Sequence, residues 1–355
     1  METDTHVYLV SAQATPNLTP ALDPATRPAR VVLVVSPDMG RRAEWLGEVL
    51  GSRGIRVEHW PIEDAWNIES SHLSFIELLD REQARAPGAG LALNATGGTK
   101  PMSIAAYEEF RARDLPIFYV HPEEDRLVWL HPASRASREL ADRVRLDAFL
   151  QAHGVRLTAA PRRSVPEPWR LELAGEVVDD IEVYGRPLSA LNALAKGAEQ
   201  SLLSEPVRGD KGALQALIDL FERYRCLQRT DDGRLAFPDE DERFFVNGGW
   251  IEAYVFDAVR RARTDDPTIQ DIAYAVQVER EQRGRAIPNE LDVVFLRNNR
   301  LHIIECKTKR FTGAGGDSPG AEVLYKLDSL RDLMGGLQAR AMLLSFQDLA
   351  DHDRT

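Results

Sequence analysis

Short apolar runs alternate with amphipathic stretches through residues 6–150, and this alternation strongly limits how the chain can fold. Amphipathic stretches such as RRAEWLGEVLGSRG and PMSIAAYEEFRARD separate several of the runs. Strands that alternate with helices form βαβ units and a mostly parallel sheet. Because the runs are almost continuously apolar, we expect a Rossmann-like α/β domain whose sheet is covered on both faces. The expected strands are VYLVSA (7–12), VVLVVS (31–36), IRVEHW (55–60), LALNA (91–95), LPIFYV (115–120) and RLVWLH (126–131).

The middle of the chain reads as a connecting segment. Three prolines in APRRSVPEPW (160–169) indicate a linker or domain edge. Two helical stretches at 187–203 and 211–225 precede an expected hairpin at 226–238 with its turn at Asp232-Gly233. Two helices and a small hairpin are compatible with a winged helix or with a plain connecting domain. A further domain is expected to begin near Phe244.

The segment NATGGTKPM, residues 94–102, joins the fourth apolar run to a helical stretch and has the composition of an anion-binding turn. Unpaired N–H groups at a helix N-terminus attract phosphate. Gly97 and Gly98 permit a tight turn and a close approach to a ligand. Thr99 suits the N-cap position, and Lys100 adds a cation. The segment is not a Walker A loop, because threonine precedes the lysine. A plain strand-to-helix turn is the alternative to a phosphate site.

A second polar loop, SAQATPNLTP (11–20), follows the first apolar run. Ligands of open α/β sheets bind at the carboxyl ends of the strands. Because both loops follow strands, they could share one rim of the sheet. Ser11, Gln13 and Asn17 would then form hydrogen bonds to a ligand.

Residues 289–311, NELDVVFLRNNRLHIIECKTKRF, contain two apolar β-type runs on either side of Asn298-Asn299. If these asparagines form a two-residue turn, Asp292 lies opposite Glu305, with Cβ atoms about 4.5–5.5 Å apart. Lys307 is two residues beyond Glu305 and therefore points to the same face. A slip of one residue would separate these side chains, so the grouping depends on the turn.

This group of charges suits metal-assisted hydrolysis of a phosphodiester. Two carboxylates hold a hard cation such as Mg²⁺ or Mn²⁺, which polarises the phosphodiester and lowers the pKa of bound water. Lys307 would stabilise the developing negative charge or orient the water. Glu252, in the first turn of a helix expected after NGGW (247–250), would be a further carboxylate near the metal. The alternatives are a surface salt bridge and, for Glu252, a favourable charge at a helix start.

Charge and composition narrow the classes of function. The formal net charge of −12 argues against a protein that coats nucleic acid by charge alone, but not against an enzyme with one basic site. Residues 279–310 hold eight Lys or Arg against five Asp or Glu, which fits such a site or a solvated face. The acidic start METDTHVYLVSAQ, two distant cysteines and no long apolar run predict a cytoplasmic protein without a membrane span.

These motifs resemble two known families. Glu252, Asp292 and the Glu305–Lys307 tripeptide resemble the PD-(D/E)xK nuclease pattern of a helix acid, a D and an ExK, although NELD stands where the pattern has PD. The segment 94–102 and the polar loop 11–17 resemble the CARF domain, a Rossmann-like sensor of cyclic oligoadenylates in type III CRISPR defence. Together they are similar to the CRISPR ancillary nucleases that join a CARF domain to a PD-(D/E)xK domain.

The resemblance implies a CARF sensor at 1–155, a linking segment at 156–243 that could be winged-helix-like, and a nuclease domain at 244–355. It implies a homodimer formed through the CARF domains, cyclic tetra-adenylate as allosteric activator, and Mn²⁺- or Mg²⁺-dependent cleavage of nucleic acid in antiviral defence. RNA, single-stranded DNA and duplex DNA stay open as substrates. The implied catalytic residues are Glu252, Asp292, Glu305 and Lys307, of which the three carboxylates hold the metal. The implied activator-binding residues are Ser11, Gln13, Asn17, Thr96, Gly97, Gly98, Thr99, Lys100 and Met102.

Other functions stay open from the sequence. A constitutive repair or restriction nuclease would use the Rossmann-like domain only as a scaffold. A cyclic-nucleotide-responsive transcription regulator would use a winged helix to bind duplex DNA without cutting it, but it would not need the D…ExK set. The sensor could also slowly degrade its own ligand, although no general base is evident beside Thr99 and Lys100.

Overall fold

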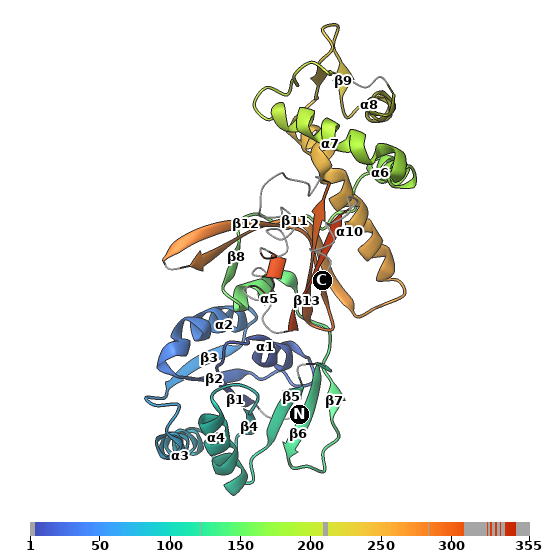
Figure 1. Cartoon of the computed structure of the whole chain (residues 1–355). Coiled ribbons are helices and arrows are strands. Elements are labelled where there is room, and N and C mark those ends of the chain that lie inside the picture. The colour runs from blue at the N-terminus through green and yellow to red at the C-terminus, as the bar shows by residue number, and fades with distance from the viewer. Residues whose placement is uncertain are drawn as a thin grey trace.

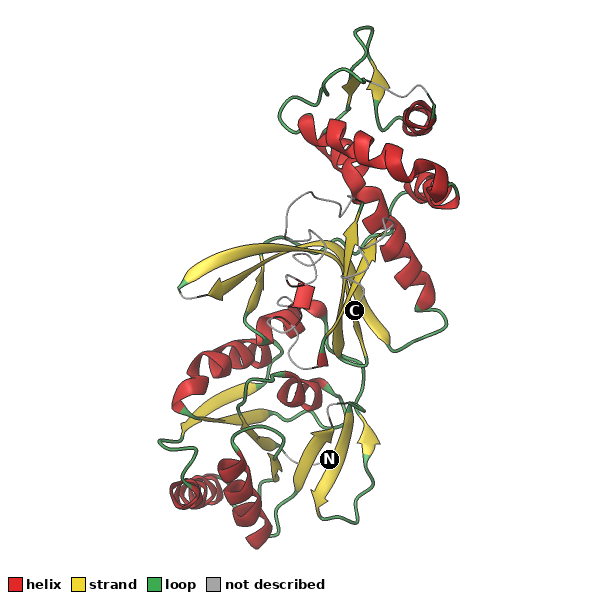
Figure 2. Cartoon of the chain, in the orientation of Figure 1, coloured by secondary structure: helices red, strands yellow, loops and turns green. Residues whose placement is uncertain are grey.

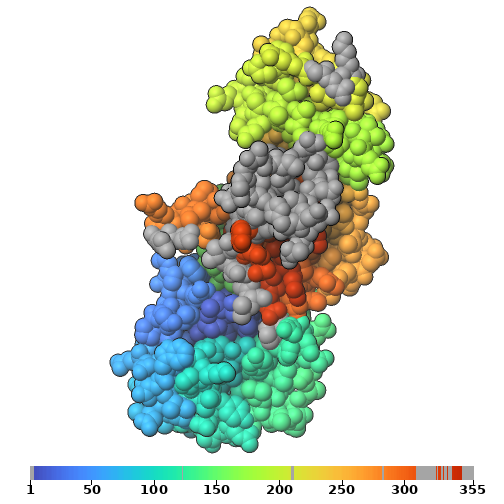
Figure 3. Space-filling model, in the orientation of Figure 1, coloured from blue at the N-terminus to red at the C-terminus, as the bar shows by residue number. Residues whose placement is uncertain are grey.

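The structure, a computed structural model, describes residues 4–121, 123–208, 212–282, 284–308, 325, 327–328, 331, 334 and 338–345. Three parts follow one another along the molecule (Figures 1 and 3). The first sheet and its helices lie at one end, a second sheet lies in the middle, and a mainly helical segment lies at the other end. Residues 346–355 of the domain expected at 244–355 lie outside the described residues.

The first part is built on a seven-stranded sheet in the order β3-β2-β1-β4-β5-β6-β7. Strands β1 to β5 pair in parallel, and β6 and β7 are antiparallel additions at one edge. This confirms the mostly parallel, Rossmann-like sheet, and a strand forms at each of the six apolar runs. The strands are β1 (Thr5–Leu9), β2 (Arg30–Val35), β3 (Arg56–Pro61), β4 (Leu91–Asn94), β5 (Ile117–His121), β6 (Arg126–His131) and β7 (Arg138–Glu139).

Helices cover both faces of this sheet, as the apolar strands require (Figure 2). Leu18 of α1 and Leu46 of α2 belong to the core on one face, whereas Phe75 of α3 and Phe110 of α4 belong to the core on the other. The helices are α1 (Thr15–Leu22), α2 (Gly40–Ser52), α3 (Ile68–Arg85), α4 (Lys100–Ala112) and α5 (Leu146–Ala152). A short 3-10 turn, η1 (Pro37–Met39), precedes α2.

The second sheet has five strands in the order β14-β13-β12-β11-β8. Strands β11 to β13 form an antiparallel meander, β14 pairs in parallel with β13, and β8 pairs with β11 at the other edge. Helix α10 (Trp250–Ala262) lies against this sheet (Figure 1). The strands are β8 (Val155–Leu157), β11 (Ile269–Gln282), β12 (Arg285–Arg297), β13 (Arg300–Lys307) and β14 (Arg340–Ser345).

The hairpin of β12 and β13 has the predicted register. Both residues of the turn Asn298-Asn299 have positive φ, 48° and 53°, as a two-residue type I′ turn requires. Arg297 pairs with Arg300, and the pairing continues without a slip to Val293 opposite Ile304. The next pair in this register would be the two carboxylates predicted to face each other.

The segment between β8 and β11 of the second sheet contains three helices, a short hairpin and a further short helix. The expected helices at 187–203 and 211–225 correspond to α7 and α8, and Gly233 in the predicted turn has φ 75°. Helix α6 was not predicted, because the proline-rich stretch 160–169 masks its start; Pro168 is tolerated there in the first turn. The elements are α6 (Pro168–Asp179), α7 (Ile181–Gly197), α8 (Ala213–Arg223), β9 (Gln228–Arg229), β10 (Leu235–Ala236) and α9 (Glu240–Phe244).

Across the described part of the chain, no helix combines the length and the apolar character that crossing a membrane would require.

Candidate active site and rim pocket

Glu252 reaches the second sheet because the chain bends sharply just before α10. The segment η2 (Phe245–Gly249) contains this kink, at Gly248, whose φ of 118° is not helical. A Cβ atom on Gly248 would lie 2.7 Å from the hydroxyl oxygen of Thr308, so glycine lets the start of α10 pack against the end of β13. The side chains of Thr308 and Asn192 are hydrogen-bonded at 2.7 Å, which ties α7 to the same point.

The hairpin gathers Asp292, Glu305 and Lys307 as predicted. The Nζ atom of Lys307 lies 2.6 Å from Oε1 of Glu305 and 3.5 Å from Oδ2 of Asp292. Asp292 also accepts a hydrogen bond of 2.7 Å from the backbone N–H of Cys306, which holds its carboxylate beside β13. Exposed fractions are 9% for Glu252, 9% for Asp292 and 3% for Glu305. We call these three carboxylates together with Lys307 the carboxylate site.

Burial and mutual repulsion shift the pKa values in the carboxylate site. Burial and the neighbouring Glu305 carboxylate raise the pKa of Asp292 to about 6. Burial and the Asp292 carboxylate raise the pKa of Glu252 well above its usual value. Burial opposes the charge on Lys307, but the Asp292 and Glu305 carboxylates outweigh it and raise the lysine pKa. Lys307 is therefore a cation at neutral pH.

The carboxylate site offers oxygen atoms to a cation. Among the described residues, Oε2 of Glu252 and Oε2 of Glu305 are buried and have no hydrogen-bond partner. A buried charged oxygen without a partner is costly, and carboxylate oxygens are the ligands that Mg²⁺ and Mn²⁺ prefer. Within that same part of the chain, no three acidic, histidine or cysteine side chains stand close enough together to hold a metal ion. The donors suit a hard cation, and three-ligand binding requires their side chains to rearrange.

The glycine turn before α4 has the geometry of a helix start. Thr99 is the N-cap, with φ −76° and ψ 160°, and its hydroxyl accepts a hydrogen bond of 3.3 Å from the backbone N–H of Met102. A Cβ atom on Gly97 would lie 2.0 Å from the carbonyl oxygen of Leu9, and Gly98 has φ 74°. Glycine is therefore needed at both positions, because the turn rests directly on the end of β1.

A pocket of about 180 Å³ lies at the carboxyl ends of β1, β4 and β5, and we call it the rim pocket. Of the residues predicted to bind the activator, Ser11, Gln13 and Thr96 line it. The wall also includes Asp125 and the turn Asn298–Arg300, which sequence reasoning did not identify. The Asn-Asn pair signalled a hairpin turn, but nothing in the sequence signalled that this turn would reach the first sheet.

Two of the predicted activator residues are buried in the fold instead. Asn17 is 1% exposed; its amide group donates a hydrogen bond of 3.0 Å to the Leu9 carbonyl oxygen, and its side-chain oxygen accepts one of 2.9 Å from Asn94. Met102 is 1% exposed and packs in the core beneath α4. Their side chains support the two loops rather than lining the pocket. The remaining four predicted activator residues are also absent from the described wall of the pocket: Gly97, Gly98, Thr99 and Lys100.

Comparison with protein families gives two matches. The family model described as the Card1 CARF domain matches residues 5–149, and the model described as the Card1-like endonuclease domain matches residues 239–354. No curated protein gives a significant sequence match.

Solved structures resemble this chain along nearly its whole length. Protein VC1899 from Vibrio cholerae has 33% identity and a TM-score of 0.87, with 99% of this chain and 90% of that chain covered. Can2 from Sulfobacillus thermosulfidooxidans, in complex with cyclic tetra-adenylate, has 27% identity and a TM-score of 0.81, with 99% and 92% covered. A type III CRISPR defence DNA nuclease activated by cyclic oligoadenylate has 18% identity, a TM-score of 0.63, and 99% and 46% covered, which shows a shared fold alone.

Proposed function

Because this chain belongs to the Card1-like family of CRISPR type III ancillary nucleases, which join a CARF domain to an endonuclease domain, we propose that it is a metal-dependent nuclease activated by cyclic tetra-adenylate. The single observation that carries the proposal is the carboxylate site, where Lys307 contacts two buried carboxylates. The similarity to Can2, whose structure contains cyclic tetra-adenylate, supports the choice of this ring as activator.

The catalytic roles follow from the charges of the site. Glu252, Asp292 and Glu305 would hold the divalent ion. When bound, Mg²⁺ or Mn²⁺ would polarise the phosphodiester and lower the pKa of a bound water. Lys307, protonated at neutral pH, would stabilise negative charge on the phosphate and would not take up a proton. Its 2.6 Å contact with Glu305 keeps the ammonium group on the carboxylate face of the hairpin.

The sensor would bind the ring without cleaving it. Ser11, Gln13 and Thr96 would contact the ring in the rim pocket, and Lys100 would add positive charge at the start of α4. A ring with two-fold symmetry suits a homodimer formed through two CARF domains. The ring would activate the enzyme by binding its competent arrangement more tightly than its inactive one. We place this activity in the cytoplasm, with invading nucleic acid as the substrate.

A cleavage assay on purified protein tests the proposal. Labelled single-stranded RNA, single-stranded DNA and supercoiled plasmid would each be incubated with cyclic tetra-adenylate and either Mn²⁺ or EDTA. We expect at least one substrate to be cut with Mn²⁺ and none with EDTA. The Lys307→Ala variant, prepared identically, excludes a contaminating nuclease. Duplex binding without cleavage of any substrate would favour a transcription regulator instead.

A further inference from the structure

The turn between β12 and β13 is part of the wall of the rim pocket. Residues Asn298–Arg300 line this pocket together with Ser11 and Thr96 from the loops of the first sheet. The same turn joins the strands that carry Asp292 and Glu305. One pocket therefore combines the expected activator-binding loops with the tip of the nuclease hairpin.

The tip presents polar atoms that have no hydrogen-bond partner in the part of the chain that the structure describes. The Nε atom of Arg300 and the Oδ1 atom of Asn298 are buried and have no hydrogen-bond partner among the described residues. Of the described residues that line the pocket, Arg300 is the one cation and Asp125 the one acid. Burial raises the pKa of Asp125 to about 7, against a hydrogen bond from Asn299 that lowers it. The acid is therefore partly protonated at neutral pH, and it compensates the charge of Arg300 only in part.

We propose that the activator binds the nuclease hairpin directly, with Arg300 contacting a phosphate of the cyclic oligoadenylate and Asn298 accepting a hydrogen bond from it. This inference rests on the proposed function and deepens it by naming residues outside the CARF domain. Arginine forms strong, charge-assisted hydrogen bonds with phosphate. An asparagine side-chain oxygen can accept a hydrogen bond from the amino group of an adenine base.

Buried hydrogen bonds hold the tip of the hairpin in place. Asn299 is 1% exposed, and its side-chain oxygen accepts hydrogen bonds of 2.6 Å from Gln270 and 3.3 Å from the backbone N–H of Val144. Its amide group donates to Asp125, which also lines the pocket. A ligand that displaces Asp125 or Arg300 therefore acts on a buried hydrogen-bonded turn and not on a loose loop.

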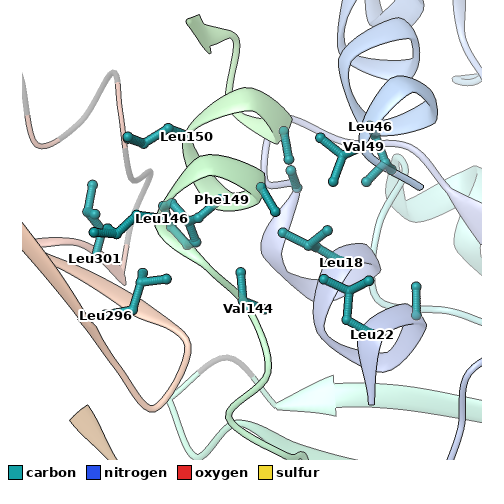
Figure 4. Packing of buried hydrophobic residues seen from close by; sticks show 14 of the residues in the cluster. Leu18, Leu22, Leu46, Val49, Val144, Leu146, Phe149, Leu150, Leu296 and Leu301 are labelled. Carbon is teal, nitrogen blue, oxygen red and sulfur yellow. The ribbon is translucent and has the colours of Figure 1, made fainter. Parts of the chain in front are cut away.

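Apolar packing continues from the tip along the hairpin. Leu296 and Leu301 lie on either side of the turn and point toward Leu146 and Phe149 of α5 (Figure 4). These residues belong to one core that contains side chains of both sheets, and close-packed interiors transmit displacement. Glu305 lies five residues beyond Arg300 on the same strand, roughly 16 Å away at the rise of a β-strand. The hairpin is thus a short, direct connection between the rim pocket and the carboxylate site.

Calorimetric titration of the full-length protein with cyclic tetra-adenylate tests the inference. We expect Arg300→Gln to raise the Kd about tenfold or more, the effect of losing one charge-assisted hydrogen bond. The matched control is Arg297→Gln, since Arg297 pairs with Arg300 across the hairpin but bonds Asp266 at 2.7 Å outside the pocket. This control should change the Kd by less than about twofold, because Arg297 does not line the pocket and residues without shared partners act nearly independently.

A second readout separates phosphate contact from a structural role. Removing a cation that binds phosphate reduces the dependence of Kd on salt concentration, so the Kd of Arg300→Gln should vary less with salt than that of the wild type. Arg300→Lys keeps the charge and should bind with intermediate affinity. If Arg300→Gln does not fold, the Kd of Arg300→Lys decides: lysine cannot reproduce the forked hydrogen bonds of arginine, so a Kd equal to that of the wild type overturns the inference.

The outcomes distinguish this inference from the proposed function. If the wild type binds neither cyclic tetra-adenylate nor cyclic hexa-adenylate, the proposed activator and the inference both fail. If the wild type binds and cleaves, while Arg300→Gln binds with an unchanged Kd, the inference alone fails. Equal weakening in Arg300→Gln and Arg297→Gln also contradicts it, because hairpin charge in general would then explain the binding.

Discussion

The glycine turn before α4 and the carboxylate site are built from opposite kinds of polar group, neutral in the first and charged in the second. Around the glycine turn, Thr99 caps α4 and Asn17 bonds both β1 and Asn94, so neutral groups are satisfied within the chain. In the carboxylate site, acids are buried close together, and Glu252 and Glu305 each have a carboxylate oxygen without a partner among the described residues. The hydrogen bonds of the sensor loops are already formed, whereas the buried carboxylates of the nuclease site would be stabilised by binding a cation.

The largest expected effect is a loss of nucleic-acid cleavage that leaves activator binding unchanged. Glu305→Ala or Lys307→Ala should lower the cleavage rate by about 10³-fold or more, because each removes a charge to which the proposed mechanism gives a role in cleavage. The Kd for cyclic tetra-adenylate should stay within about twofold of wild type, since neither residue lines the rim pocket. Single-turnover cleavage and calorimetry measure the two quantities.

The control for this loss is Glu281→Gln, on the same sheet. Glu281 forms an exposed ion pair with Arg41, and exposed pairs contribute little. Its cleavage rate should match the wild type. Retained cleavage in Lys307→Ala would remove the carboxylate site from the mechanism.

The second effect tests whether the glycine turn is preorganised. In Gly97→Ala, the new Cβ would clash with the Leu9 carbonyl oxygen, so the end of β1 must move. We expect a loss of about 1–3 kcal/mol of stability and weaker activator binding, measured by thermal unfolding and calorimetry. Gly51→Ala, in α2 with open space around the new Cβ, is the matched control and should be neutral or slightly stabilising. Equal Tm values for the two variants would mean that the turn is adaptable.

The third experiment uses pH, because the carboxylate site contains acids whereas the glycine turn is held by neutral groups. The pKa of Asp292 rises from 3.8 to about 6 on folding, so the folded state binds the proton more tightly than the unfolded state. The stability that this provides is present at low pH and is lost as pH rises through about 6. Metal binds deprotonated carboxylates, so the Tm increase caused by Mn²⁺ should be small at about pH 5 and grow above about pH 6.

Asp292→Asn is the control for the pH experiment, because asparagine can still accept the hydrogen bond from the Cys306 N–H but does not titrate. It should flatten the pH dependence of the Mn²⁺ effect and weaken metal binding measured by calorimetry. An Mn²⁺ effect of equal size at low and high pH in the wild type would contradict a carboxylate metal site.

The smallest effect concerns Lys100, which is exposed and lies outside the described wall of the rim pocket. Lys100→Ala should raise the Kd for cyclic tetra-adenylate only about two- to fivefold. Water and salt screen the attraction between an exposed lysine and a phosphate, so its contribution to the binding free energy is small. Calorimetric titration of both variants, Lys100→Ala and Arg300→Gln, shows which substitution raises the Kd more. A larger loss in Lys100→Ala than in Arg300→Gln would reverse the order, and an unchanged titration curve would remove Lys100 from the phosphate site.

The sequence predicted those features that depend on local periodicity. Continuous apolar runs identified the parallel sheet, and the Asn298-Asn299 turn fixed the register that brings Asp292 near Lys307. These predictions succeed because strand period and turn chemistry act over a few residues.

Features that depend on tertiary contact could not be predicted. The sequence places Asn17 and Ser11 in one polar loop at 11–20, but the second half of that stretch is helical. Asn17 lies in α1 and bonds the backbone of β1, whereas Ser11 lines the pocket. The side chains of Asn299 and Asp125 are hydrogen-bonded across a separation of 174 residues, and no local pattern signals that contact. The rim pocket was therefore only half predicted: its first-sheet loops were expected, and its hairpin wall was not.

The most direct test of the account is the cleavage rate measured with and without cyclic tetra-adenylate and with and without Mn²⁺, in all four combinations. An activator-gated metal nuclease predicts rapid cleavage only when both are present, at least about tenfold faster than with Mn²⁺ alone, as typical allosteric coupling allows. Equal rates with and without the ring, at saturating Mn²⁺, would contradict it and would make the CARF domain a scaffold.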